Sequence, residues 1–260
     1  MTPTTSSVVF WRAFGCLAIF FMLSPLVLVV VFSFGTNELA TLPIGTLTFR
    51  WYSELFANTN FATALRNSLV VTLSVGLAST VTGVLAALAF ARWRPAAANG
   101  AIMLLSLPVM MPPLVLAMAL ATSFSASKFQ LGLHTVIPSH IVFTQPLVIL
   151  ILYAQLSSFN FAILDSARDL GASPWRAFRT VLLPLIGPTI IGAALIAMAV
   201  SLDDFVITFF TIGNGMTLPT LVWGMLRKGL DPSVNALGAL ILVATIGSSM
   251  LALGLTRYRG

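Results

Sequence analysis

The chain has 260 residues, of which 58% are hydrophobic and only 8% are charged. With a mean hydropathy of +1.01, it has too little polar surface to cover a water-soluble globule of this size. The net charge of +6 does not indicate a nucleic-acid partner, because the 13 Lys and Arg residues are scattered between long apolar runs and form no basic patch with interleaved aromatic residues. The composition predicts a protein of the lipid bilayer.

Uncharged intervals map the candidate membrane spans, since a transmembrane helix needs about 20 mostly apolar residues. They predict an all-α membrane protein with six transmembrane helices in one domain, residues 1–260. The expected spans, in chain order, are residues 13–35, 65–91, 98–122, 137–157, 180–211 and 233–256. A further uncharged stretch, 205–226, is interrupted by Gly213-Asn214-Gly215, a turn signal, so we assign its first part to the end of span five and its second part to a short surface helix.

The first span follows Arg12 and is too long for a cleaved signal peptide, so we expect it to be retained. With the N-terminus in the cytoplasm, eight of the 13 basic residues fall in inside segments and five in outside segments. This bias follows the positive-inside rule, so we expect both termini in the cytoplasm. The segment 159–179 then lies in the cytoplasm, between spans four and five.

Three prolines interrupt the third span, at Pro108, Pro112 and Pro113. A proline breaks the hydrogen-bond ladder of a helix, which a membrane tolerates only where neighbouring helices or a cavity satisfy the freed groups. Both a packing kink and a gating role are compatible with this pattern.

Metal binding has no support in the sequence. Cys16, His134 and His140 are its only cysteine and histidines, and they form no cluster with the spacing of metal ligands. We expect both histidines to be polar residues near the membrane surface.

The cytoplasmic segment contains the stretch DSARDLGASPWRAF, which begins at Asp165 and holds four charged residues. Gly171 is able to end one helix in the left-handed conformation, and Ser173 followed by Pro174 is typical of the start of another. Such a helix, corner and helix would serve as an ordinary solvated connector. A connector, however, has no need of bulky apolar side chains, and this segment has three: Leu170, Trp175 and Phe178. They indicate a surface for a partner protein.

This segment resembles the EAA loop of ABC importer permeases, whose pattern is EAA, three residues, Gly, nine residues and I-x-L-P. Asp165-Ser166-Ala167, Gly171 and the residues 181–184 (VLLP) match that spacing, with Asp, Ser and Val in place of Glu, Ala and Ile. The stretches 140–146, 201–205 and 229–237 are similar to the spermidine/putrescine permease subunits. On these residues the chain is identified as a member of that family.

The resemblance implies a type I ABC importer permease of the bacterial inner membrane that works by alternating access. It implies a homologous second permease subunit, two ATPase subunits that bind ATP and Mg, and an extracytoplasmic substrate-binding protein. This chain has no Walker A pattern, so we expect no enzyme activity and no cofactor on it. In the family the loop inserts into a cleft of the ATPase, which makes these the candidate coupling residues: Asp165, Ala167, Asp169, Leu170, Gly171, Ser173, Trp175, Arg176 and Phe178.

An acidic pair, Asp203 and Asp204, interrupts the apolar run of span five. A charge at the bilayer centre costs on the order of 3 kcal/mol, so an intramembrane carboxylate is a functional hypothesis by default. One interpretation is a substrate pathway for a cation, lined by Asp203, Asp204 and Phe205. The other is that one aspartate caps a broken helix or pairs with an arginine while its neighbour faces water.

An intramembrane aspartyl protease is excluded, because neighbours in a helix project about 100° apart and do not form a catalytic dyad. The resemblance implies spermidine or putrescine as the substrate, and a cation fits the acidic pair. The alternatives are another small solute, such as a different amine, an amino acid derivative or ferric iron, or a carrier that works without ATP.

Overall fold

A computed structural model describes residues 5–37, 41–228 and 232–257 of the chain. The described part is almost entirely helical, and its only β pairing is an isolated antiparallel bridge between Gly35 and Leu47. The chain ends at 1–4 and 258–260, whose cytoplasmic location we expected, lie outside the described residues, as do the first three residues of the stretch 229–237.

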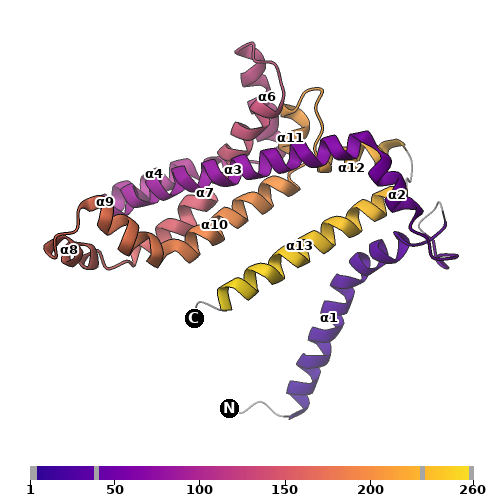
Figure 1. The fold of residues 1–260 in the computed structure, drawn as a ribbon, viewed down its shortest axis with the longest axis horizontal. Helices are drawn as coiled ribbons and strands as arrows, with labels where there is room; N and C mark the ends of the chain where they lie inside the picture. The colour runs from indigo at the N-terminus through magenta and orange to yellow at the C-terminus, as the bar shows by residue number, and fades with distance from the viewer. Residues whose placement is uncertain (1–4, 38–40, 229–231, 258–260) are drawn as a thin grey trace. The chain divides into compact units, whose positions relative to one another are not determined.

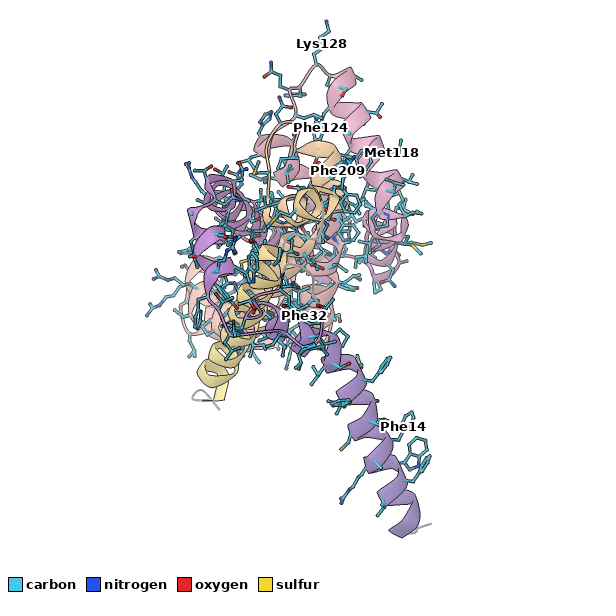
Figure 2. All side chains as sticks on the ribbon, turned by 90° about the vertical axis from the view of Figure 1, so that its right-hand side faces the viewer. Phe14, Phe32, Met118, Phe124, Lys128 and Phe209 are labelled. Carbon is cyan, nitrogen blue, oxygen red and sulfur yellow. The ribbon has the colours of Figure 1, made fainter. Side chains whose placement is uncertain are left out.

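Residues 1–62 and 222–260 form one of two compact units. Its helices are α1 (Thr5–Phe32), α2 (Arg50–Ala57) and α13 (Ser233–Arg257). Helix α13 packs against both α1 and α2, and Trp51 Nε1 donates a 2.6 Å hydrogen bond to the Gly35 carbonyl in the connection between α1 and α2. Figure 2 shows side chains such as Phe14 projecting from α1. A helix that is apolar around its whole circumference is suited to lipid.

Residues 63–221 form the second unit. Most of helix α3 (Thr59–Arg92) belongs to this unit. The remaining elements are α4 (Pro95–Leu105), α5 (Leu107–Met110), α6 (Pro113–Ala126), α7 (Leu133–Ser157), α8 (Ala162–Asp169), α9 (Pro174–Ala177), the π-helical turn η1 (Phe178–Leu182), α10 (Leu183–Asp203) and α11 (Val206–Thr211). Helix α12 (Leu218–Lys228) begins in this unit and ends in the other.

Helices α3, α7 and α10 run side by side, with α8 and α9 at one end of them and α11 toward the other (Figure 1). The main core of the unit lies between α7 and α10, around Leu152, Leu156 and Ile186, each at most 1% exposed. Glycines let α3 approach this pair closely: a Cβ on Gly83 would lie 2.5 Å from Val148 Cγ1 of α7, and one on Gly76 would collide with Met198 of α10. Small residues at helix contacts are typical of membrane bundles.

Two of the expected spans are interrupted. Instead of one helix over 98–122, the chain forms α4, α5 and α6, with extended backbone at Met111 and Pro112. The physical reason is that Pro112 and Pro113 lack the N–H groups that a continuous helix would need. The range 180–211 is divided at Asp204, whose backbone is extended between α10 and α11.

By length and composition, four segments among the described residues are able to cross a membrane. They are Val9–Phe32, Thr59–Arg92, Leu133–Ser157 and Pro174–Asp203, the last of which joins α9, η1 and α10. Three shorter apolar helices accompany them: Pro95–Leu105, Pro113–Ala126 and Ser233–Gly247. The structure therefore establishes an all-helical membrane architecture.

Candidate functional site

The segment between α7 and α10 has the local geometry that its sequence predicts. Gly171 has φ of +88°, and its N–H donates to the Arg168 carbonyl while the Ala172 N–H donates to the Ala167 carbonyl. These two bonds complete a Schellman motif at the end of α8. Ser173 Oγ accepts a hydrogen bond from the Arg176 N–H at 3.3 Å, and Pro174 occupies the first position of α9. The expected helix, corner and helix are confirmed.

The helix pair is fixed to the bundle on one side and exposed on the other. Leu164, Ala177 and Leu182 are buried in the same core as the ends of α7 and α10. In contrast, Leu170 is 90% exposed and Trp175 is 67% exposed, and the Trp175 ring stacks on Phe178 with 5.4 Å between centroids. The segment therefore presents apolar side chains from a rigid base, as a docking element requires.

The charges of this segment contribute little to the stability of the fold. Asp165 and Arg168 form an ion pair of 3.6 Å with exposed side chains, and exposed pairs of this kind are typically worth less than about 1 kcal/mol. Asp169 and Arg176 are exposed as well. Ala167 is half-buried against the core. The charges are thus available to water or to a partner.

The acidic pair lies at the other end of α10, about 30 Å from the start of that helix at about 1.5 Å per residue. Asp203 is exposed, whereas the Asp204 side chain is only 14% exposed. Phe205 is half-buried, and its ring lies 5.2 Å from that of Phe209. Helix α11 packs on α6, where Figure 2 labels Phe209 beside Met118 and Phe124. The structure thus gives the two adjacent carboxylates different surroundings.

His140 is the residue of this region that the sequence interpretation missed. The expectation of a polar residue near the membrane surface did not include burial inside the protein, and the His140 side chain is only 2% exposed. Its Nδ1 lies 2.8 Å from Ser201 Oγ of α10, and its Nε2 lies 2.9 Å from Thr208 Oγ1 of α11 and 3.3 Å from Asp204 Oδ2. A signal was present, since His140 falls within the expected span 137–157 and an ionisable residue at that depth is a functional candidate. His134, in contrast, is exposed.

One oxygen of the Asp204 carboxylate also accepts a 3.0 Å hydrogen bond from the Thr208 N–H and so caps α11. The capping interpretation is therefore correct for Asp204, and Asp203 faces outward. Among the described residues, however, no Lys or Arg lies within 4.0 Å of either aspartate. The capping bond uses Oδ2 of the Asp204 carboxylate and supplies no positive charge to balance it.

A narrow crevice runs beside this cluster. Besides His140, Asp204 and their neighbours, its walls include Ser68 and Val71 of α3 and the loop residue Thr217. Ser68 Oγ accepts a hydrogen bond from the Leu218 N–H at 2.8 Å, which ties α3 to this wall. In this structure the crevice is too narrow to hold a water molecule. Access to Asp204 from this side requires the helices to move.

The fold is that of the permease subunits of ABC importers. The chain is similar to a chain of the bacterial alginate ABC transporter in complex with an alginate pentasaccharide-bound periplasmic protein, with a TM-score of 0.72, 16% identity, and 96% and 94% of the two chains covered. It is also similar to a chain of the MetNI methionine ABC transporter in inward facing conformations, with a TM-score of 0.60, 17% identity, and 75% and 94% covered.

The chain belongs to the family of binding-protein-dependent transport system inner membrane components, whose model matches residues 79–258. It is 33% identical to the putrescine transport system permease protein PotI of Escherichia coli K12 over 86% of this chain and 82% of that protein. It is 31% identical to the spermidine/putrescine transport system permease protein PotC of the same strain, with 85% and 84% covered. These similarities confirm the resemblance that was inferred from the segment 165–184.

Proposed function

We propose that this chain is the permease subunit of an ATP-driven importer for spermidine, putrescine or a closely similar polyamine. The observation that carries the substrate class is the Asp204 carboxylate, which is largely buried and has no Lys or Arg within 4.0 Å among the described residues. A carboxylate in a low-dielectric site favours a cation and disfavours an anion. The similarity to PotI and PotC supports the same class.

The coupling role falls to the helix pair α8 and α9. Its exposed side chains Leu170 and Trp175 would dock in a cleft of an ATPase subunit, where apolar anchors dominate binding energy. Closure of two ATPase subunits on ATP and Mg would push this pair, and α10, which begins in the same core, would transmit the movement toward Asp204. Hydrolysis on the partner chains would reset the cycle.

The assembly that we propose has two permease subunits, which enclose the pathway between them, and an extracytoplasmic binding protein that delivers the substrate. Each permease has six spans, in which the shorter apolar helices complete the membrane crossing, and both termini are in the cytoplasm. In the pathway, Asp203 and Asp204 attract the ammonium groups, and Phe205 adds a cation-π contact. The location is the bacterial inner membrane.

Uptake by the assembled transporter in proteoliposomes tests the substrate class. We expect labelled putrescine to accumulate with ATP, and excess spermidine to compete with it. 1,4-Butanediol has the same four-carbon chain without ammonium groups and should not compete. Competition by the diol equal to that by spermidine would contradict recognition of charge, and loss of uptake without ATP separates this function from that of an ATP-independent carrier.

A further inference from the structure

We infer that His140 is a positioning residue that holds the Asp204 carboxylate in place for the ammonium group of the substrate. The inference rests on the proposed function, because it assigns to His140 the orientation of a carboxylate that this function places in the substrate pathway. His140 lies on α7, whereas Asp204 lies at the break between α10 and α11.

The hydrogen bonds of His140 span the break. Ser201 precedes it on α10 and Thr208 follows it on α11, and the imidazole contacts both at 2.8 Å and 2.9 Å. All three residues are at most 5% exposed. A break in a helix leaves its two ends free to change angle, so a side chain that binds both ends from a third helix fixes that angle.

One tautomer satisfies the whole cluster. With its proton on Nε2, the ring donates to Thr208 Oγ1, and its Nδ1 accepts the proton of the Ser201 hydroxyl. The protonated Nε2 then lies 3.3 Å from Asp204 Oδ2, a contact that is electrostatically favourable. The Thr208 N–H donates to the same Asp204 oxygen at 3.0 Å. The Thr208 N–H and the imidazole therefore both contact Oδ2 of the Asp204 carboxylate and hold its orientation.

The charge of the site is preserved by this arrangement. An imidazole in its neutral form would orient the carboxylate without cancelling its charge, whereas an Arg or Lys at the same place would form an ion pair and compete with an ammonium group. The ionisable groups nearest in the chain do not interfere: Asp203 is exposed, and α11 and α6 contain no charged residue. The preorganised carboxylate then binds the substrate without first having to be ordered.

Three substitutions at position 140 separate positioning from packing. The amide of Gln reaches about as far as Nε2 and that of Asn about as far as Nδ1, so H140Q retains the contact with Asp204 and Thr208, whereas H140N retains only that with Ser201. In polyamine uptake by the full transporter with its binding protein, we expect H140N and H140L to raise the KM for spermidine about tenfold. We expect H140Q to stay within about threefold of wild type, and the maximal rate to change little in all three.

A double-mutant cycle with Asp204 provides the decisive readout. If His140 acts through Asp204, then H140N/D204N is no worse in KM than D204N alone. H140N should instead add its full effect to that of D203N, the control on the neighbouring exposed carboxylate, and H134N should leave the KM unchanged. The amount of assembled complex is measured for each variant.

Additive effects of H140N and D204N, or an unchanged KM in H140N, would overturn the inference while leaving polyamine transport intact. A fall in assembled complex or maximal rate in H140N and H140Q alike, with KM unaltered, would show a purely structural histidine and would overturn it too. Wild-type transporter that takes up no spermidine would instead contradict the proposed function itself.

Discussion

At the scale of single residues, the corner between α8 and α9 depends on one glycine. Gly171 has φ of +88°, and an added Cβ would meet nothing within 4 Å. A substitution there is therefore penalised by backbone conformation and not by a collision. Because Asn tolerates the left-handed region better than other side chains do, and Pro excludes it, the position allows a graded test.

We expect G171N to retain most polyamine transport, G171A to lose part of it at a cost of about 1 kcal/mol, and G171P to abolish it. G171P also removes the N–H that donates to the Arg168 carbonyl. Uptake is to be compared with the amount of chain inserted in the membrane, which should be equal in all variants. Normal uptake by inserted G171P would refute the coupling role of this corner.

Residue-level features were predictable from the sequence where they depend on neighbours in the chain. Gly171, Ser173 and Pro174 carry signals that act within a few residues, and the structure has the expected corner. The buried contacts of His140 were not predicted, because its partners lie 61 and 68 residues away. Contacts at that separation depend on how α7 packs against α10 and α11, which one sequence does not reveal.

At the scale of elements, the helix pair α8 and α9 presents Trp175 as its largest exposed apolar group. Aromatic anchors dominate binding energy at interfaces, with losses of about 2 kcal/mol or more on truncation. We therefore expect W175A to weaken binding of the ATPase subunit about 30-fold while leaving the fold intact. Trp11 of α1 is the matched control, since it is 66% exposed against 67% for Trp175.

Binding of the purified ATPase to the permease in nanodiscs measures this effect. We expect W11A to bind as wild type does. Equal weakening of ATPase binding in W11A and W175A would indicate that both substitutions disturb the fold of the permease. Unchanged binding in W175A would show that Trp175 of α9 does not contribute to the interface with the ATPase.

The contact between α3 and α7 depends on the absence of a side chain at Gly83. Val148, on the facing helix, is fully buried and β-branched, so it has one strongly preferred rotamer and does not move aside easily. We expect G83A to lower the thermal midpoint of the purified permease complex, since overpacking costs about 1–3 kcal/mol.

The control is Gly100 of α4, where a Cβ would meet nothing within 4 Å. G100A should leave the midpoint unchanged or raise it, because Ala favours helix over Gly by up to about 1 kcal/mol. A midpoint in G83A equal to that of G100A would mean that α3 and α7 do not approach closely at this point. Helix existence was predictable from the apolar runs, and the prolines indicated an interruption of span three. The residues at which the helices end, Met111 and Pro112 in one case and Asp204 in the other, were not predictable in the same way.

At the scale of the whole molecule, residues 63–221 place the helix pair α8 and α9 at one end of α10 and the cluster of His140 and Asp204 at the other. Helix α10 and its π-helical start connect them as one continuous helical segment, Pro174–Asp203. In the proposed mechanism, this segment would carry a movement imposed on α9 to the carboxylate. The membership of the importer permease family is consistent with this arrangement.

In the proposed function, this chain couples polyamine recognition to ATP hydrolysis on the ATPase subunits. We would reconstitute it with its second permease and ATPase subunits in liposomes and measure ATP hydrolysis as polyamine-loaded binding protein is added. We expect stimulation of hydrolysis by spermidine or putrescine that is lost in G171P and shifted to higher polyamine concentration in D204N. Hydrolysis that does not respond to polyamines in the wild-type assembly would contradict the proposed function.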